Sequence, residues 1–587
     1  MPIVLPSLAS RELAAEGQPL RGARGLALDV LLIAALAALV GGVVVLAQRW
    51  NAPIRATTPI DLSPRALPGY TLLSLSRGFA AYVLSLVFTL VYGTIAAHSK
   101  RAEKVMIPLL DIGQGIPVLG FLPGLVLGMV ALFPRSNIGL ELACILMIFT
   151  GQVWNMVFSF YGSLRSIPTE LKEVARIHRF GWLKTFGTVE VSSSAIGLVW
   201  NSMMSMAGGW FFLTVNEAFT LGDRDFRLPG VGSYMAVAIE KGDQKAMLWA
   251  IVAMSAMIVA VDQLLWKPLV AWSQRFRFED LASSDKPKSW VLDLVRRSPL
   301  VRQLGLQSQR LAKRRASKAP PEVKTAVTEA GASATGARVR EGLVVGLGVV
   351  AALASVWGAI RLVHLLTGVS RAEWTHLAAA LGATFLRTAA ALGLAVLWTV
   401  PAGILIGRSA KWSRRLQPIV QLVASFPAPM IFPIVTGVMI AMRVPFAVTA
   451  SILMLLGAQW YVLFNVLAGA SAVPHDLDEA AETYGMVGSE RWKKLFLPAI
   501  FPYLVTGLIT AAGGAWNASI VAETLAYKGR TLETFGLGST ITHATASANF
   551  PLLAAGVLTM SAALIVLNRT VWRPLYRLAE SKYSLNR

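Results

Sequence analysis

Long apolar runs separated by short polar segments are the main pattern of the chain. Twelve runs approach or exceed the roughly 20 residues that an α-helix needs to cross the hydrocarbon core of a bilayer. They lie at about 26–47, 72–97, 105–132, 137–160, 186–214, 246–270, 342–366, 376–406, 415–441, 445–470, 495–522 and 549–570. Several contain prolines, which a transmembrane helix tolerates where neighbouring helices cover its backbone. The pattern predicts an all-α polytopic membrane protein with twelve transmembrane helices.

The composition fits a membrane protein and excludes several other classes. Of the 587 residues, 55% are hydrophobic and 15% are charged, whereas soluble proteins carry about 25% charged residues. An ordinary soluble enzyme, a disordered scaffold and a nucleic-acid binder are therefore excluded. The net charge of +22 is interpreted as basic loops beside a membrane. Cys144 is the single cysteine and the six histidines are scattered, so we expect no disulfide and no metal site.

The basic residues also predict the orientation of the chain. Twelve spans place both termini on one side, and that side then carries 39 of the 54 Lys and Arg residues against 12 on the other. Without the 16 basic residues of the long loop at 267–340, the ratio is still 23 to 12. Basic loops stay in the cytoplasm, so both termini are expected there. Residues 1–25 are polar, and no cleavable signal peptide is predicted.

The chain contains an internal duplication. At an offset of 310 residues Arg77 falls on Arg387, and at an offset of 306 Trp210 falls on Trp516 and Glu217 on Glu523. Tryptophans, prolines and charged residues in register are not chance matches of apolar residues. Each half holds six predicted spans, so the halves share one topology and form parallel repeats related by an axis along the membrane normal. A transport pathway, if present, is expected between them.

The duplication divides the chain into five parts. We assign 1–25 to a cytoplasmic N-terminus, 26–272 to the first repeat, 273–340 to a basic cytoplasmic linker, 341–575 to the second repeat and 576–587 to a cytoplasmic tail. The linker carries fifteen Lys or Arg residues against six Asp or Glu residues. Two interpretations of it stay open: a flexible tether, which is favoured, or a short amphipathic helix around 290–297 on an anionic membrane surface.

A cytoplasmic loop of the second repeat, 474–498, has the features of a docking element. Pro474 ends the tenth span and the acidic residues that follow can cap a short helix. Small alanines on that helix allow another protein to pack closely, and Gly485 allows a tight exit. The alternative is a plain interfacial helix.

The spacing in this loop resembles the signature of binding-protein-dependent ABC importer permeases with the type I fold. The matching positions are Glu479, Ala480, Ala481, Gly485, Leu495, Leu497 and Pro498. The wider pattern resembles the nitrate, sulfonate, taurine and bicarbonate branch of that family. The first repeat departs from the signature, with Glu173, Ala175 and Arg179 at the positions of Glu479, Ala481 and Gly485. Both loops are expected to form ATPase-coupling helices, the first in a degenerate form.

The resemblance implies an ATP-driven importer in the bacterial cytoplasmic (inner) membrane. This chain contains no phosphate-binding Gly-rich motif. Two separate ABC ATPase subunits would therefore bind ATP and Mg²⁺. The chain itself is expected to be a transport subunit and not an enzyme. A periplasmic or lipid-anchored binding protein would deliver a small solute, an anion in this branch. The rival interpretation is a secondary ion-coupled transporter. It would need intramembrane carboxylates, for which the candidates are Asp111, Glu141 and Asp262.

Polar and aromatic residues within the spans are candidates for the translocation pathway. They are Gln152, Asn201, Trp210, Gln459, Trp516 and Asn517. Trp210 and Trp516 stand beside paired glycines, which would allow each ring to project into a central cavity, although packing is the alternative. Core packing is favoured for Trp154 and Trp460. Glu217 and Glu523 are expected at the periplasmic interface, with a structural or a docking role.

Overall fold

The fold is known from a computed structural model that describes residues 58–221, 224–276, 289–299 and 356–583, with a few isolated positions besides. The first predicted span, most of the seventh, the N-terminus and most of the linker lie outside these residues. Trp290–Arg297 of the linker forms the helix α13; its contact with a membrane surface stays a prediction.

The first repeat is a chain of helices with one β-hairpin. Its elements are α3 (Leu67–His98), α4 (Lys100–Gly115), a 3₁₀ turn (Val118–Phe121), α5 (Leu122–Leu132), α6 (Ile138–Arg165), α7 (Thr169–Ile177), α8 (Trp182–Thr185), a π-helical turn (Phe186–Glu190), α9 (Val191–Asn216), β1 (Ala218–Leu221), β2 (Arg224–Arg227), α10 (Val231–Lys241), α11 (Gln244–Val261), a π-helical turn (Asp262–Trp266), α12 (Lys267–Ser273) and a 3₁₀ turn (Gln274–Phe276).

The second repeat has the same order of elements. They are α16 (Arg371–Arg408), α17 (Ala410–Ala424), α18 (Ala428–Ala441), α19 (Phe446–Ser471), α20 (His475–Thr483), α21 (Gly488–Arg491), a π-helical turn (Trp492–Phe496), α22 (Leu497–Ala522), β3 (Thr524–Tyr527), β4 (Arg530–Glu533), α23 (Leu537–Ala546), α24 (Phe550–Leu567), a π-helical turn (Asn568–Trp572) and α25 (Arg573–Lys582). A shorter apolar helix, Val356–Leu366, precedes them.

The part of the chain that the structure describes contains fewer spans than the twelve predicted for the whole chain. Among the described residues seven helices are long and apolar enough to cross a membrane, and an eighth span is possible if a bent pair counts as one. That pair, Arg415–Ala424 and Ala428–Ala441, bends by 88° at Pro427. The run 105–132 is likewise divided, between α4 and the turn that follows Pro117. Proline has no N–H to donate, and these two runs break at Pro117 and Pro427, whereas Pro108, Pro418 and Pro433 lie within continuous helices.

The two β-hairpins correct the prediction of a purely helical fold. β1 pairs antiparallel with β2, and β3 with β4 in the same register. In the second hairpin Lys528 and Gly529 both have positive φ, 49° and 72°. This conformation belongs to a two-residue turn whose twist matches that of the strands.

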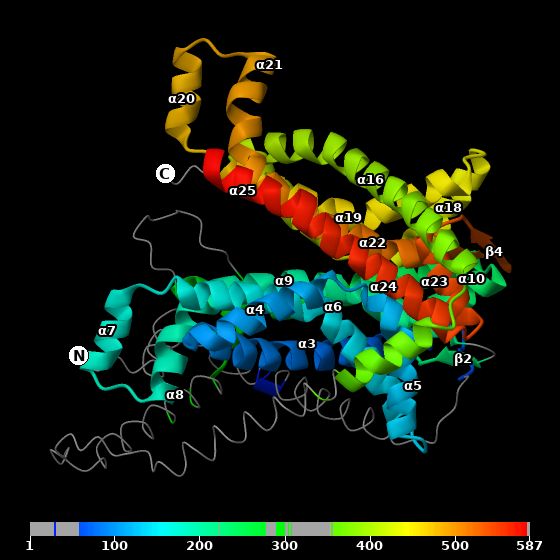
Figure 1. The fold of residues 1–587 in the computed structure, drawn as a ribbon. Helices are drawn as coiled ribbons and strands as arrows, with labels where there is room; N and C mark the ends of the chain where they lie inside the picture. Colours follow the sequence, from blue (N-terminus) through cyan, green and yellow to red (C-terminus); the bar gives the residue numbers. More distant parts are fainter. Residues whose placement is uncertain are drawn as a thin grey trace.

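The repeats form two layers joined by a shared core. In Figure 1 the first repeat lies below and the second above, with α7 and α20 at one end and the hairpins at the other. The largest core cluster contains residues from both repeats, such as Trp210, Met254, Trp516 and Leu553. On the outside, α3 exposes a row of valines that includes Val83, at 55% exposure. Apolar side chains exposed on long helices are typical of a surface that contacts lipid.

Candidate functional site

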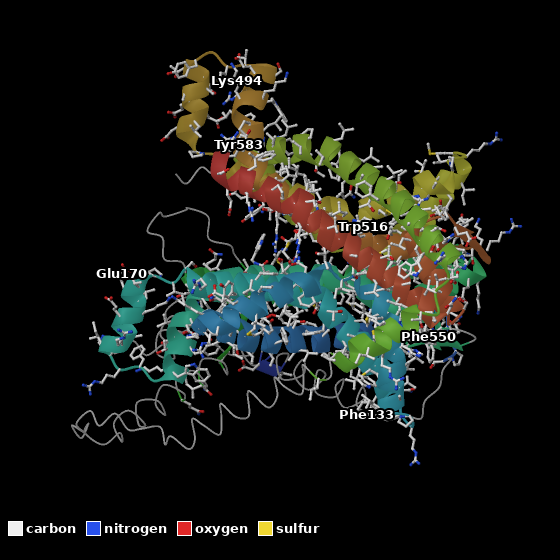
Figure 2. The ribbon with its side chains drawn as sticks, viewed as in Figure 1. Phe133, Glu170, Lys494, Trp516, Phe550 and Tyr583 are labelled. Carbon is white, nitrogen blue, oxygen red and sulfur yellow. The ribbon has the colours of Figure 1, made fainter. Side chains whose placement is uncertain are left out.

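Two short helices, α7 and α20, extend beyond the bundle at matched positions in the two repeats. Glu170 of α7 and Lys494 near α20 mark these two projections in Figure 2. Each helix is nine residues long and follows a proline, Pro168 or Pro474. A proline just before a helix has a fixed φ and cannot continue the preceding span, so the chain leaves the bundle there.

The predicted coupling residues divide into an exposed and a buried set. Glu173, Glu479 and Ala480 are exposed on the projecting helices. Ala175 and Ala481 are only 4% exposed and hold each helix against its own loop. The exposed face of each helix is therefore available to a partner, whereas the buried alanines set its distance from the loop behind it.

Arg179 and Gly485 occupy equivalent positions at the ends of the two helices. Both have a left-handed backbone, with φ of 47° and 65°. In both loops the N–H of the next residue returns to a buried alanine carbonyl, Phe180 to Ala175 and Met486 to Ala481, at 2.9 Å. This is a helix C-terminus that favours glycine. Arg179 therefore adopts the same backbone conformation as Gly485, but a left-handed conformation costs a non-glycine residue more free energy than it costs glycine.

The second loop is tied to the bundle by ion pairs. The carboxylate of Asp478 on α20 pairs with Arg408 at the end of α16 and accepts a 2.8 Å hydrogen bond from Arg491. Lys172 stands at the matching position of α7. Leu497 and Pro498 begin α22 directly after the π-helical turn, so they connect the loop to the fifth core helix of the repeat.

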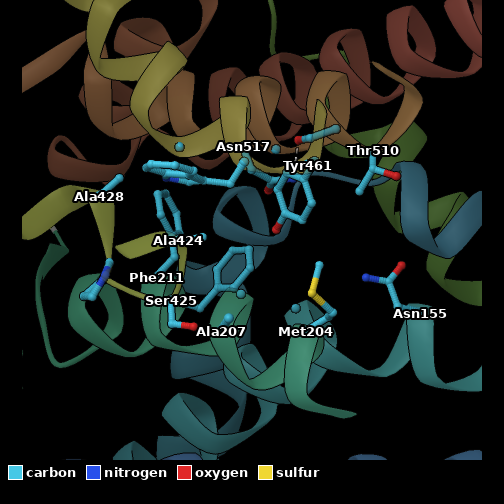
Figure 3. A pocket seen from close by; sticks show the side chains of 18 of the residues that line it. Asn155, Met204, Ala207, Phe211, Ala424, Ser425, Ala428, Tyr461, Thr510 and Asn517 are labelled. Carbon is cyan, nitrogen blue, oxygen red and sulfur yellow. Dashed lines mark hydrogen bonds between the residues drawn. The ribbon is translucent and has the colours of Figure 1, made fainter. Parts of the chain in front are cut away.

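A cavity of about 160 Å³ lies between the repeats. The 3₁₀ turn after Pro117 and the bend at Pro427 contribute to its wall, together with α6, α9, α19 and α22. Figure 3 shows Asn155 and Thr510 at one side of it and Ser425 and Ala428 at the other. The two breaks in the helices thus meet at the centre of the molecule.

The structure divides the predicted pathway residues. Asn517 lines the cavity, and its Oδ1 accepts a 2.8 Å hydrogen bond from the backbone N–H of Val118 in the other repeat. Gln152, Asn201, Trp210, Gln459 and Trp516 are absent from its wall. Asn201 donates to Ser159 and to the Gly197 carbonyl of its own helix, and Gln459 accepts from Trp398.

Trp210 and Trp516 lie in the packed interior, with 2% and 1% of their surface exposed. A Cβ placed on Gly78 would lie 2.8 Å from the ring of Trp210. The neighbouring glycines do not turn these rings into the central cavity; instead Gly208 and Gly514 themselves form part of its wall. The idea that these rings line the central cavity is corrected for this reason.

Trp154 and Trp460 are the matched tryptophans that do line the cavity. The sequence favours core packing for both, because the apolar pattern of α6 and α19 does not show which face of each helix meets the cavity.

Two buried ion pairs correct the expectation for Glu217 and Glu523. Neither glutamate is exposed, so neither can contact a docking protein in this conformation. The Nη1 of Arg77 donates to Oε1 of Glu217 at 2.7 Å, and that of Arg387 donates to Oε1 of Glu523 at 2.6 Å. Each glutamate also accepts from the start of a following helix, through the N–H of Gly232 or Gly538. Each pair fastens three elements of its repeat together.

The three carboxylates that a secondary transporter would need all have basic neighbours. Glu141 accepts two hydrogen bonds from Arg77, at 2.5 and 2.7 Å. Asp111 pairs with Arg573 across the two repeats at 2.9 Å, and Asp262 lies 3.9 Å from Lys267. Within the described residues no cluster of three metal-ligating side chains occurs.

Comparison with known proteins gives matches over both repeats. The family model described as the binding-protein-dependent transport system inner membrane component matches residues 89–265 and 399–572. The bicarbonate transport system permease protein of Synechococcus elongatus is 30% identical over 141 residues, which are 24% of this chain and 49% of the relative. The nitrate import permease protein of Leptolyngbya laminosa is 30% identical over 145 residues, 25% and 50% of the two chains.

A third relative has a different named substrate. The taurine transport system permease protein of Escherichia coli is 31% identical over 156 residues, 26% of this chain and 53% of the relative. The chain thus spans about half the length of the curated relatives that it matches.

Proposed function

The chain belongs to the family of binding-protein-dependent transport system inner membrane components, and we propose that it forms the whole membrane-spanning part of an ATP-driven importer. Both six-span halves would come from this one chain, with twelve transmembrane helices in all. The proposed location is the bacterial cytoplasmic membrane, with both termini in the cytoplasm. The excess of basic residues on that side supports this orientation.

The pair of projecting helices is the observation that carries the proposal. α7 and α20 lie at the same end of the molecule, at equivalent positions, and each presents an exposed glutamate beside a buried alanine. A monomeric carrier has no use for two such projections. Two ATPase subunits, one on each helix, would use both.

The mechanism then follows from the connections of the helices. ATP and Mg²⁺ would be bound by the two partner ATPases, and their closure would move α7 and α20. The π-helical turns carry this movement directly into α9 and α22, whose side chains line the central cavity. Rocking one repeat against the other would open the cavity to a binding protein on the far side.

The relatives support a small anionic substrate. Their names specify bicarbonate, nitrate and taurine. We extend to this chain only what these share, a small solute with one anionic group, delivered by a periplasmic or lipid-anchored binding protein.

The rival function, an ion-coupled secondary transporter, has less support. Such a carrier needs carboxylates that gain and lose protons or ions along the pathway. Asp111 and Glu141 are ion-paired, Asp262 has Lys267 beside it, and none of the three lines the central cavity. A carboxylate that lies outside the wall of this cavity does not meet the solute there.

Co-purification tests the proposal. The full chain, carrying an affinity tag, should bring down ATPase subunits in a ratio of two to one, and the complex should hydrolyse ATP. Glu479→Lys should release an ATPase, and Glu173→Lys should act more weakly because the first loop departs from the signature. The exposed Glu580 on α25 provides a matched control, Glu580→Lys. Absence of any ATPase from the wild-type complex, or equal retention in all three variants, would refute the assignment.

A further inference from the structure

Among the described residues, the wall of the central cavity holds no carboxylate, guanidinium, ammonium or imidazole group. Its polar members are neutral amides and hydroxyls, and the remainder are aromatic, aliphatic or sulfur-containing residues and glycines. We infer that the solute carried by this chain is an organic anion with an apolar, ring-sized body, such as an aryl sulfonate or carboxylate, and not a small inorganic anion. This inference rests on the proposed function, because it specifies the substrate class of the same pathway.

The absence of charge disfavours a small hydrated anion. Nitrate and bicarbonate lose hydration free energy when they leave water, and only many hydrogen-bond donors or a cation in the cavity can compensate for that loss. The guanidinium groups of Arg77 and Arg387 are paired with Glu217 and Glu523, and neither lines the cavity. A solute that carries its charge at one end of a larger apolar body loses less hydration free energy when it enters the cavity.

Aromatic rings make up a large part of the wall. They come from both repeats and are Trp154, Phe211, Phe212, Phe426, Trp460, Tyr461 and Phe464. Aromatic faces and edges stabilise a planar partner by about 0.5–1.5 kcal/mol for each ring pair beyond the burial of its surface. Sites of this kind, apolar with a few neutral polar groups, are typical of binding sites for organic molecules.

The size of the cavity agrees with one ring. Its volume is about 160 Å³, and an apolar protein cavity of about 150 Å³ is known to accept benzene. A second, more apolar cavity of about 240 Å³ shares Phe426, Ala428, Leu456 and Trp460 with it. A substituent on the ring would therefore meet further apolar surface and not a polar wall.

Neutral donors are present for a single anionic head. The amide of Asn155 makes no hydrogen bond with the described residues, whereas that of Asn517 is engaged by Val118 and Gly513. Thr510, at the same side of the cavity in Figure 3, donates its hydroxyl proton to the Thr506 carbonyl of its own helix. The hydroxyl of Tyr461 in the wall makes no hydrogen bond with the described residues. The amide of Asn155 and the hydroxyl of Tyr461 can orient a sulfonate or carboxylate but cannot neutralise it. They fit a head that remains partly hydrated while the ring is buried.

Direct binding to the full chain in lipid nanodiscs tests the inference, with benzenesulfonate, methanesulfonate, nitrate and bicarbonate as probes in titration calorimetry. Benzenesulfonate and methanesulfonate share the head group, so their difference measures the contribution of the ring. Burial of the ring should make benzenesulfonate bind at least about tenfold more tightly than methanesulfonate. Nitrate and bicarbonate should bind no better than methanesulfonate.

Two variants of the wall and one control locate the binding. Trp460→Leu and Phe211→Leu each remove a ring from the cavity and should weaken benzenesulfonate binding by about tenfold. Trp249→Leu removes a tryptophan that is 48% exposed on α11 and should leave it unchanged. Tighter binding of nitrate or bicarbonate, no binding of any probe, or equal affinity in all three variants would overturn the inference. Failure of the proposed function would instead appear as absence of ATPase subunits from the purified complex.

Discussion

Arg77 and Glu217 are 140 residues apart in the sequence and 2.7 Å apart in the interior of the first repeat. The guanidinium of Arg77 is 1% exposed and also holds Glu141, so one cation serves two buried carboxylates. In the second repeat Arg387 pairs with Glu523 alone, and Ala447 stands at the position of Glu141. The hydroxyl of Thr534 accepts from Arg387 in its place, and the carbonyl of Phe535 accepts from Arg387 as that of Pro229 does from Arg77. The two halves therefore share the ion pair and a carbonyl acceptor but not the second carboxylate.

Removing Arg77 should destabilise the protein more than removing Arg387. Arg77→Gln leaves two buried carboxylates without a cation, and breaking a buried pair in this way costs about 3–5 kcal/mol. Arg387→Gln leaves one carboxylate, which retains its hydrogen bonds from Thr384 and Gly538. Thermal unfolding of the purified chain measures both, with the exposed Arg371→Gln as control. Equal shifts for Arg77→Gln and Arg387→Gln would contradict this account.

A methyl group at Gly538 should disturb the start of α23. Its Cβ would lie 2.4 Å from the Ser519 carbonyl oxygen, which is backbone and cannot move aside cheaply. Gly538→Ala should therefore lower the unfolding temperature by several degrees. Gly393, within α16, has no atom within 4 Å of such a Cβ, and Gly393→Ala should stabilise by about 0.5–1 kcal/mol. A shift of the unfolding midpoint in the same direction for both variants would contradict this expectation.

Glycine should improve the first coupling loop. Arg179 has a φ of 47°, and relief of this conformation by Arg179→Gly should stabilise the loop by about 1 kcal/mol. Limited proteolysis at the exposed segment after α7 is the measurement, with slower cleavage expected. Arg176→Gly, in the right-handed region of α7, is the control and should accelerate cleavage. Faster cleavage of Arg179→Gly would show that its side chain, not its backbone, determines the stability of the loop.

Asp478 should determine how rigidly α20 is held. Asp478→Asn removes the carboxylate that joins Arg408 and Arg491, so hydrogen exchange across 475–491 should accelerate. Asp476→Asn changes an exposed residue of the same helix and should leave exchange there nearly unchanged. Indistinguishable exchange in the two variants would mean that Ala481 packing alone holds the helix.

Trp210→Ala should act through stability and not through transport. The side chain is buried against Gly78, and truncation of a buried tryptophan costs about 3–5 kcal/mol. Uptake per folded molecule should stay close to that of the wild type, with thermal unfolding and quantified membrane levels as the two measurements. Wild-type stability together with reduced uptake per molecule would restore a role for Trp210 in the pathway.

The sequence predicts the repeats well because they depend on local patterns. The spans near α3, α6, α16 and α19 follow from the lengths of the apolar runs, and the two coupling loops follow from proline, alanine and glycine at fixed spacing. These features require no knowledge of which helix packs against which.

The cavity and the buried pairs could not be predicted in the same way. Whether Trp154 or Trp210 faces the cavity depends on how α6 and α9 are rotated about their own axes. A helix that is apolar on all sides has no hydrophobic periodicity from which this rotation could be predicted. Glu217 was placed at an interface because its partner, Arg77, lies on a distant helix. The pair could have been predicted from the repeats, because an arginine and a glutamate occur at matching positions in both. A guanidinium and a carboxylate that occur together within apolar spans suggest an ion pair.

The positions of the π-helical turns give information about how the two repeats arose. They occupy Phe186–Glu190 and Asp262–Trp266 in the first repeat and, 306 residues later, Trp492–Phe496 and Asn568–Trp572 in the second. A π-helical turn holds one residue more than an α-helical turn, so each marks a place where the helix accommodates an extra residue. Their recurrence at identical positions in both repeats indicates that the ancestral repeat already held them before it was duplicated. The replacement of glycine by Arg179, found in only one repeat, belongs to the later history in which the two copies diverged.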